Sequence, residues 1–492
     1  MTISKAMNIS LTGLKANQAA LNVVSHNIAN MNTEGYVRQR ANFAEVRTIP
    51  IDNSISAQIG SLSGVKLSGI TTAANDYLNG YYRTQKSILD GLVADADSAG
   101  QLSDLLDTLK GAGLMDSLTE FYNSANSLNQ NPTDYSLRVN FVENAKAVAN
   151  KFNTMYSSIN GLKETKIGDG TVTSAATSQV GTYVGNLNED LEALVNINKQ
   201  IASHSGDDSL KTQRDQILAD LSSLANVEVT INASGTANVS LGDRDLVLSG
   251  EVVGKVQLNT DGTLSVIDKK DNATDITSKV TGGKIGGLMG GLSSVEDALT
   301  SINDLANAFA ALMNGIQTYV NGDVKAAAYD RANDRLVVST EDLFTTNDGS
   351  GVVNAKNIAI NATVYNTPDL VAAARVDTSV AGWEQSVGNG DNALEFYTSQ
   401  STKIPALGHL TISDYLTGLS ARAAMNAASK ASAADTQAAI VDNIQNQILA
   451  ETGVNLDEEL SNMIMYRQAY NASARVFSAC VEIYDTLIAL GT

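Results

Sequence analysis

The chain has 492 residues and a formal net charge of -20 at pH 7. This length is enough for about three domains, and the acidic balance argues against a nucleic-acid-binding protein, which needs a basic face. No run approaches the roughly 20 apolar residues of a membrane span, and Met1–Ala6 lacks the apolar core that starts a cleaved signal peptide. We therefore expect no nucleic-acid partner, no membrane insertion and, if the protein leaves the cell, export without a cleaved signal peptide.

The first 30 residues carry apolar side chains in alternating steps of four and three. They are Ile3, Met7, Leu14, Leu21, Val24 and Ile28, with Ser10 and Asn17 at polar steps. The last segment repeats the pattern with Leu456, Leu460, Met463, Tyr470, Ala474, Phe477, Val481, Tyr484 and Ile488, interrupted by Arg467. This spacing is typical of a coiled-coil seam, in which each helix needs a partner to bury its stripe. We therefore expect the two ends of the chain to pair.

The predicted N-terminal helix is almost free of charge. Between Ala6 and Thr33 the one fully charged residue is Lys15. A helix face in water usually carries Lys and Glu, whereas a neutral amide-rich face can lie against protein without burying unpaired charge. We expect one side of this helix to pack on the C-terminal helix and the other on neighbouring subunits. Composition alone also allows an ordinary hairpin of terminal helices in a monomer.

Helical patterns fill the segments that follow. Gly35 ends the first helix, and residues 41–72 are expected to form extended loops or a short hairpin. Apolar periodicity then predicts helices over about 72–109, 114–129, 133–160, 181–204 and 208–225. The chain contains four prolines, and this scarcity suits long uninterrupted helices.

The apolar period then changes to two. Short alternating runs between Val227 and Val266, separated by turns rich in Gly and Asp, predict antiparallel strands. The glycine-rich segment Thr281–Leu292 leads into a helical ladder that reaches Ile316, and we interpret its glycines as a tightly packed turn. Residues 324–360 are mixed and include a strand at 335–339, and a helix is expected near 369–375.

The chain ends in two long predicted helices. An Ala-rich helix covers about 411–450, and Gly453 breaks it. Asn455 is expected to cap the last helix, and Glu458 stands three residues later in a capping-box pattern.

These patterns predict a mainly α fold with an inserted β-rich domain. The termini are expected to return to one end of the molecule, with the β-rich part farthest from them. The expected domains are a terminal coiled-coil assembly domain (1–40 with 451–492), a helical middle domain (41–225, 286–320 and 366–450) and an outer antiparallel β domain (226–285 with 321–365).

Histidine, cysteine and glycine-rich segments can form catalytic, metal or phosphate sites, but here they lack the sequence spacing that such sites require. The histidines are scattered and form no His-Glu-x-x-His motif: His26, His204 and His409. The glycine-rich segment is not a phosphate loop, because Lys284 is followed by Ile285. Residues 389–392 lack the ligand spacing of a calcium loop, and Cys480 is expected to be a small packing residue. We expect no catalytic, metal or cofactor site, and a protein that is not an enzyme.

Motifs near both ends resemble those of a known family. The segments SHNIANMNTEGY (25–36) and VNLDEEL (454–460) resemble the opposite end signatures of the axial proteins of the bacterial flagellum, which comprise rod, hook and hook-associated proteins. Interior motifs resemble the hook-associated group in particular: Asp76–Leu78, Gln213–Leu218, Gly282–Leu288 and Gly390–Asn392.

The resemblance implies an extracellular structural protein at the junction of hook and filament. Copies of the chain would connect the two by helical self-assembly of their terminal helices, after export through the flagellar type III apparatus. The implied partners are other copies, the hook protein, a second hook–filament junction protein (FlgL-like) and an export chaperone (FlgN-like). The alternatives are another axial component, such as the hook protein or the second junction protein, and an enzyme that uses the β-rich region.

The residues expected at the assembly surface come from both ends. At the N-terminal end they are Met7, Leu14, Leu21, Val24, Asn27, Ile28, Asn30, Gly35 and Tyr36. At the C-terminal end, where the chaperone is also expected to bind, they are Leu456, Leu460, Met463, Tyr470, Phe477, Val481, Tyr484 and Ile488.

Overall fold

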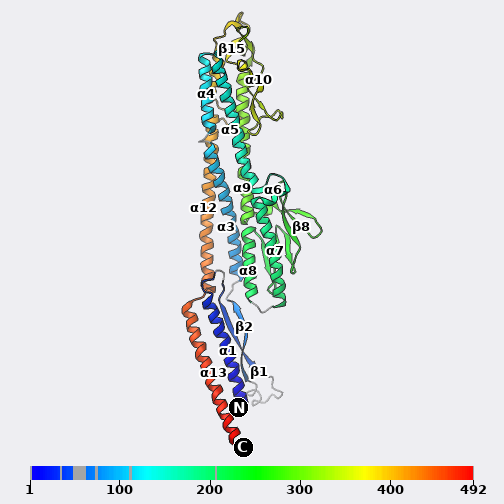
Figure 1. Ribbon diagram of the computed structural model, residues 1–492, viewed down its shortest axis with the longest axis vertical. Coiled ribbons are helices and arrows are strands. Elements are labelled where there is room, and N and C mark those ends of the chain that lie inside the picture. Colours follow the sequence, from blue (N-terminus) through cyan, green and yellow to red (C-terminus); the bar gives the residue numbers. More distant parts are fainter. Residues whose placement is uncertain are drawn as a thin grey trace.

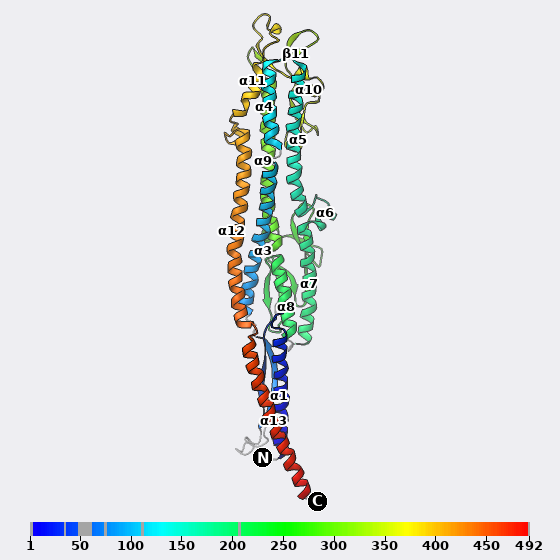
Figure 2. The same cartoon turned by 60° about the vertical axis from the view of Figure 1, so that its left-hand side comes forward.

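The computed structural model describes residues 3–33, 36–47, 62–72, 76–109, 113–204 and 208–490. The molecule is elongated, and both termini lie at the same end (Figure 1). Paired helices form that end, a bundle of long helices forms the middle, and a cap that contains β-strands closes the far end (Figures 1 and 2). This order confirms the predicted mainly α fold with paired terminal helices.

The terminal end is an antiparallel helix pair covered by a β-hairpin. Its elements are α1 (Ile3–Ala29), α13 (Leu456–Leu490), β1 (Gln39–Arg47) and β2 (Leu62–Thr72). The hairpin lies against α1, and the hydroxyl of Thr12 accepts a hydrogen bond from the backbone N–H of Val65 (3.3 Å). The hairpin therefore sits with the terminal helices in space, whereas the sequence grouped residues from 41 onward with the middle domain.

Long helices build the middle of the molecule. They are α3 (Asp76–Leu109), α4 (Met115–Gln130), α5 (Tyr135–Ile167), α9 (Gly283–Gln317) and α12 (Ile412–Thr452). Helix α3 packs on both α12 and α9, and α5 packs on α4 and α9. The core contains a chain of phenylalanine rings with centroids 5.0 to 6.5 Å apart, from Phe121, Phe141, Phe152, Phe309, Phe344 and Phe396. Rings at such distances bury large apolar areas in tilted and edge-on contacts, so they lock the helices of the bundle together.

A smaller domain lies on the flank of the bundle, about midway along it (Figure 1). Its elements are α6 (Val172–Thr177), α7 (Gln179–Ser203), α8 (Asp208–Leu224), β3 (Glu228–Ile231), β4 (Ala237–Leu241), β5 (Arg244–Leu248), β6 (Glu251–Val252), β7 (Gly254–Leu258), β8 (Leu264–Asp268) and β9 (Ala273–Asp275). The strands form antiparallel sheets in the orders β3-β4-β5-β6 and β7-β8-β9, as the alternating runs predicted. Asn198 of α7 holds a strand in place, because its amide both donates to the carbonyl of Ala237 (2.8 Å) and accepts from its N–H (2.9 Å).

The cap at the far end has strands of its own. Its elements are β10 (Val320–Asn321), β11 (Val324–Asp330), β12 (Arg335–Val338), β13 (Phe344–Thr346), β14 (Ile358–Ile360), α10 (Ala362–Asn366), β15 (Ala374–Asp377) and α11 (Asp391–Thr398). The sequence grouped 226–285 with 321–365 in one outer β domain, but the structure places the first range on the flank and the second at the tip (Figure 1). The two ranges share no sheet, because each buries its apolar face against different helices.

The prediction of a helix near 369–375 is wrong. Pro368–Leu370 forms a single 3-10 turn, and strand β15 follows it. In β15, Ala374 and Val376 point into a small core that also contains Leu336, and the strand pairs with β11. This pairing overrides the helix preference of an Ala-rich run, because propensity is weaker than tertiary packing.

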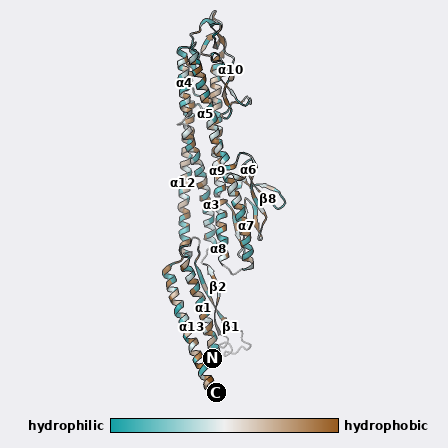
Figure 3. Ribbon diagram, in the orientation of Figure 1, coloured by the Kyte–Doolittle hydropathy of each residue, from teal (hydrophilic) through white to brown (hydrophobic). Residues whose placement is uncertain are grey.

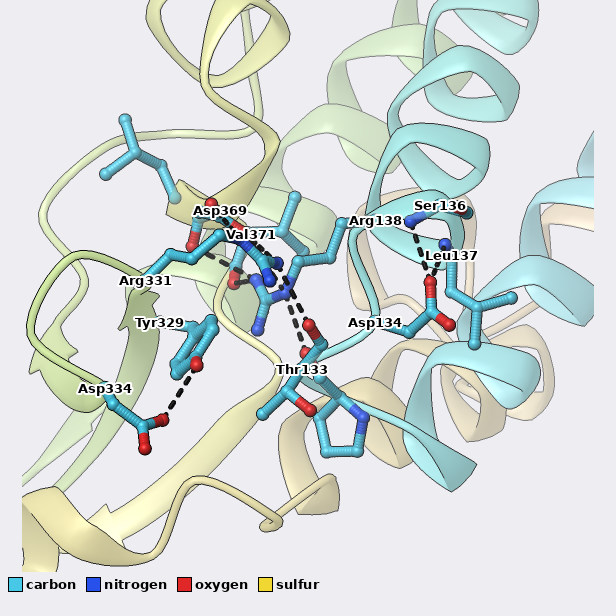
Figure 4. Close-up of polar contacts among 12 residues, drawn as sticks. Thr133, Asp134, Ser136, Leu137, Arg138, Tyr329, Arg331, Asp334, Asp369 and Val371 are labelled. Atoms are coloured by element: carbon cyan, nitrogen blue, oxygen red, sulfur yellow. Dashed lines mark hydrogen bonds and ion pairs between the residues drawn. The ribbon is translucent and has the colours of Figure 1, made fainter.

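Arg138 of α5 anchors the cap to the bundle (Figure 4). Its fully buried guanidinium donates to the carbonyls of Pro132 and Val371, both at 2.7 Å, and to that of Asp369 at 3.1 Å. On the cap side, Arg331 forms a bidentate pair with the Asp369 carboxylate (2.7 and 2.9 Å). Burial lowers the pKa of Arg138 to about 10, so the group stays charged at neutral pH. The carbonyl acceptors replace the water that this cation has lost.

The glycine-rich start of α9 lets it approach α3 closely. A Cβ at Gly287 would lie 2.0 Å from the carbonyl oxygen of Gly91, and a Cβ at Gly91 would lie 3.2 Å from that of Gly283. The backbones of the two helices thus touch without side chains between them. The tight packing predicted for the glycine-rich segment is confirmed, but its residues from Gly283 onward lie in helix α9 and not in a turn.

Gly287→Ala should lower the free energy of unfolding by about 1–3 kcal/mol, because its methyl group would collide with the α3 backbone. Gly315→Ala is the matched control in the same helix, where a Cβ has open space. The control should be neutral or stabilise by up to about 1 kcal/mol, because Ala favours helix. Denaturant unfolding of the full chain measures both, and equal stabilities would contradict the close contact.

Candidate assembly site at the paired termini

The helix pair meets over a face of small residues on α1. The buried residues of this face are Ser10, Gly13, Ala16, Ala20, Val23, Val24 and Asn27. A Cβ at Gly13 would lie 3.0 Å from the hydroxyl oxygen of Ser473 on α13. Because both α13 and the hairpin cover α1, its central positions accept only small side chains.

The predicted apolar ladders flank this face. On α1, Val24 is buried, and the half-buried members are Met7, Leu14, Leu21 and Ile28. On α13, the half-buried members are Met463, Tyr470, Phe477 and Val481. The exposed members are Leu456, Leu460, Tyr484 and Ile488. The single chain therefore covers the middle of the ladders and leaves both ends of the α13 ladder open.

An ionic cluster joins the two ends of the chain. Arg38 donates through Nε to Glu459 (2.7 Å) and through Nη1 and Nη2 to the two oxygens of Glu458 (2.9 and 2.8 Å). Its backbone N–H donates to the carbonyl of Thr452, the last residue of α12 (2.9 Å). The side chains of Glu459 and Arg38 are 1% and 8% exposed, whereas that of Glu458 is 54% exposed. We call Arg38, Glu458, Glu459 and Asn27 the terminal clamp.

Asn27 completes the clamp from the side of α1. Its Nδ2 donates to the carbonyl of Gln39 (2.8 Å) and to Glu459 (3.2 Å). Its Oδ1 accepts from the N–H of Gln39 (3.0 Å) and from the hydroxyl of Tyr36 (2.7 Å), which also contacts Nδ1 of His26 (2.9 Å). This 1% exposed amide has both its donor and acceptor capacity in use, so it is firmly oriented.

The clamp brings together the two terminal sequence motifs. Asn27 and Tyr36 come from the first motif, and Glu458 and Glu459 come from the second. Asn30 lies nearby, half-buried, and donates to the carbonyl of His26 (2.9 Å). Gly35, which was also predicted at this surface, lies outside the described residues.

Asn455 caps α13 as predicted. Its Oδ1 accepts hydrogen bonds from the N–H groups of Asp457 (2.9 Å) and Glu458 (3.3 Å). The capping-box contact of Glu458 does not form, because its carboxylate binds Arg38 instead. Two charge-assisted bonds to a guanidinium are stronger than one bond to a neutral backbone N–H.

Shifts in pKa keep the side chains in and around the clamp in the protonation states that their hydrogen bonds require. The hydrogen bonds from Arg38 lower the pKa of Glu458, and the same contacts raise the pKa of Arg38. Burial, and then the charge of Glu459, raise the pKa of Tyr36 to about 12. At neutral pH Glu458 is therefore ionised, and Tyr36 keeps the proton that it donates to Asn27.

Periodicity does not reveal the role of Arg38. Apolar spacing says nothing about a single cation in a connecting segment, and Glu458 and Glu459 look like ordinary charges at a helix start. The available signal is their combination: an arginine two residues after Tyr36, and an adjacent acidic pair at the start of the helix predicted to pair with the first.

We also looked at residue types that could form a metal site or react chemically. Within the described ranges, no group of three or more His, Cys, Asp or Glu side chains is placed to hold a metal ion. His26, His204 and His409 are exposed, and Cys480 is buried as expected for a packing residue. Over the same ranges, no helix combines the length and apolarity that crossing a membrane requires.

Comparison with known proteins gives matches along the chain. Residues 99–322 match the helical domain of the flagellar hook-associated protein FlgK. The flagellar hook-associated protein 1 of Salmonella typhimurium is 24% identical, over 99% of this chain and 100% of the relative. That of Bacillus subtilis is 26% identical, over 96% of each. The chain is similar to flagellar hook-associated protein 1 over nearly its whole length.

A solved flagellar protein of low sequence identity has the same fold. The flagellar hook junction protein FlgK of Burkholderia pseudomallei is 14% identical, with a TM-score of 0.56 over 76% of this chain and 99% of that one. Residues 7–36 match the flagella basal body rod protein, and 445–490 match the C-terminal part of the basal body rod FlgEFG proteins. These two segments contain most of α1 and all of α13, and with them the clamp residues Asn27, Glu458 and Glu459, whereas Arg38 lies two residues beyond the first segment.

Arg38→Ala should loosen the terminal end strongly. Leaving the buried carboxylate of Glu459 without its cation costs about 3–5 kcal/mol, whereas Glu458→Gln should cost about 0–1 kcal/mol because this side chain is half-exposed. Arg40→Ala, at an exposed arginine on β1, is the matched control. Amide exchange with labelling times of seconds should show faster exchange of α1 in Arg38→Ala only. Equal effects of Arg38→Ala and Arg40→Ala would show that the clamp does not join the ends.

Proposed function

We propose that this chain is a structural junction protein of the bacterial flagellum, whose copies connect hook to filament by helical self-assembly of their terminal helices. The observation that supports this function most strongly is the exposed apolar surface of the paired terminal helices. The clamp fixes them side by side, yet hydrophobic residues occur along α13 toward its free end (Figure 3), and several of them are exposed.

The outer surface of α13 is suited to association. Large apolar side chains that are more than half exposed follow one another along it: Ile464, Met465, Val476, Ile483, Tyr484 and Leu487. Burying such a side chain contributes about 1.5–3 kcal/mol. Extended apolar surface on an acidic protein marks a site of contact with other proteins. Several copies packed around one axis would cover this surface.

The outer face of α1 supports the same arrangement. Its exposed residues include Asn8, Gln18, Asn22 and Ser25, which are polar but uncharged. Such side chains can form hydrogen bonds with a neighbour, and Lys15 is the one fully charged residue that is exposed beside them. A face on α1 with a single charge, beside an apolar face on α13, therefore fits packing against further copies on both sides.

Assembly also supplies stability that the terminal end lacks. Ordering a residue costs about 1–2 kcal/mol of backbone entropy, and helices in proteins are stabilised mainly by packing of an apolar face. The small buried residues of α1 offset little of this cost within one chain. Contacts with neighbouring copies would provide the rest, so the terminal helices would form an inner tube and the bundle the next shell.

The partners follow from this arrangement. Other copies would contact the chain laterally, the hook protein would lie on one side of the layer, and a second junction protein (FlgL-like) on the other. Before export through the type III apparatus, a chaperone (FlgN-like) would cover the apolar ladder of residues 456–488. The role needs surfaces and no chemical reaction, so we propose no catalytic activity.

A role as another axial component fits less well. The basal-body rod protein FlgG of Caulobacter vibrioides is 38% identical, but over 77 residues that cover 15% of this chain. The hook-associated protein 1 relatives match 96% or more of it. Similarity along the whole chain, including the bundle, favours the junction.

Cells that lack this gene should form hooks without filaments and release flagellin into the medium, because filament growth would have no junction to start from. Electron microscopy counts the filaments, and an immunoblot of the medium measures the flagellin. Expression of the wild-type chain should restore filaments. Missing or straight hooks in the deletion strain would point instead to the hook protein and contradict the junction role.

A further inference from the structure

Lys15 is the one fully charged residue on the outer face of α1. Exposed residues of this face follow one another in steps of three and four: Asn8, Leu11, Lys15, Gln18, Asn22 and Ser25. Among the residues that the structure describes, none forms an ion pair with Lys15. The proposed function covers this face with a neighbouring copy, and burying an ammonium group without a carboxylate is far more costly than burying amides. The neighbour therefore has to supply an acidic side chain.

Two exposed sides of α13 could face Lys15 of a neighbouring copy. One side is apolar and includes Met465, Val476, Ile483 and Leu487. Residues of the other side, which we call the polar side, are exposed and also stand three or four apart: Arg467, Asn471, Arg475, Ser478, Glu482 and Asp485. The apolar residues offer no acceptor for an ammonium group. The polar side of α13 is therefore the one that Lys15 fits.

Charges on the polar side change sign along α13. Arg467 and Arg475 come first, and Glu482 and Asp485 lie nearer the free end. In the part of the chain that the structure describes, no ion pair holds either carboxylate. The position of the neighbour along the axis thus decides whether Lys15 meets arginines or carboxylates.

Within one chain, Lys15 lies level with the arginines of the polar side. Gly13 lies against Ser473, so the antiparallel register places Lys15 level with Asn471. The two arginines stand one helical turn to either side of this level. A neighbour at the same height would bring both arginines toward Lys15, and like charges oppose such a contact. The charges therefore favour neighbours that are displaced along the axis.

A displacement of 11 residues places Lys15 beside Glu482. At roughly 1.5 Å per residue this corresponds to about 16 Å along the axis. The outer face of α1 is then covered over its whole length, because Asn8 lies level with residue 489 and Ser25 with residue 472, both within α13. In the same register Asn22 lies beside Arg475, whose guanidinium donates to amide oxygens.

Asp457, an exposed acidic residue in the first turn of α13, fits Lys15 less well. This pairing would place residue 16 of α1 level with Leu456, where α13 begins. The outer face of α1 beyond that level would then lie past the neighbour's helix. Asp457 also stabilises its own helix, since negative charge is favourable in the first turn. Glu482 is therefore the partner that covers more of α1.

We propose that Lys15 of one copy forms an ion pair with Glu482 of the copy beside it. Helix α1 of the first copy packs antiparallel on the polar side of α13 of the second, and the apolar side stays free for other contacts between copies. Because the two surfaces differ, the contact repeats from copy to copy around the axis with the same small step, which gives a helical arrangement. This inference rests on the proposed function, since it specifies one lateral contact of the assembly.

Charge exchange tests the ion pair. Full-length variants are added to isolated hooks, and the retained protein is measured. Lys15→Glu and Glu482→Lys should each reduce retention at least tenfold, because each brings like charges together, and the combined variant should recover most of it. Lys403→Glu, at an exposed lysine between α11 and α12, makes the same charge change and should be retained like wild type.

Cysteine cross-linking tests the displacement. In a Cys480→Ser background, copies with Lys15→Cys are mixed with copies with Glu482→Cys and bound to hooks. Mild oxidation should join the two kinds of copy by a disulfide. Copies with Asn471→Cys, on the same side of α13, are the matched control and should stay separate from Lys15→Cys copies.

The ion pair is overturned if Lys15→Glu is retained like Lys403→Glu, or if the combined variant binds no better than its parts. Cross-links through position 471 instead of 482 would overturn the displacement and the pairing with it. If wild type itself is not retained on hooks, the proposed function fails, and this contact fails with it.

Discussion

The arrangement of this protein depends on how a buried carboxylate, Glu459, meets its guanidinium, Arg38. Removing both charges from water is costly, and the cost is offset only when every oxygen and N–H of the pair finds a partner. Asn27 and Glu458 supply the remaining contacts. Since the backbone of Arg38 also binds the end of α12, the same residue fixes the helix pair and its direction relative to the bundle. A contact this complete tolerates few alternative geometries, so it sets one alignment of the two ends.

The remainder of the molecule is stabilised differently. The bundle and cap share a large apolar core with phenylalanine rings in tilted and edge-on contact, and the flanking domain has a core of its own. Arg138 joins cap to bundle through buried carbonyl contacts, and glycines let α9 lie directly on α3. Among the residues that the structure describes, the terminal end has no comparable core, because most of those it buries on α1 are small. The body can therefore fold without neighbours, while the terminal end gains most from them.

The sequence predicts much of this structure because long helices leave a strong periodic signal. The matching ladders predicted the pairing of α1 with α13, and the alternating runs predicted the flanking strands. Contacts between distant segments leave no such signal. Arg38 is one cation in a connection, β15 forms because β11 accepts it, and the position of 226–285 on the flank depends on which helices its strands cover. Periodicity also placed the apolar ladder of α1 at the centre of the helix contact. The centre is instead occupied by small residues, because both α13 and the hairpin pack against this side of α1.

The central claim is that the ends of this chain, aligned by the clamp, are completed by other copies. Amide hydrogen exchange of residues 5–30, in the free chain and in the chain bound to isolated hooks, tests it most directly. The account predicts weak protection in the free chain and strong protection on the hook, while the amides of α5 stay equally protected in both. Equal protection of residues 5–30 in the two states would contradict it.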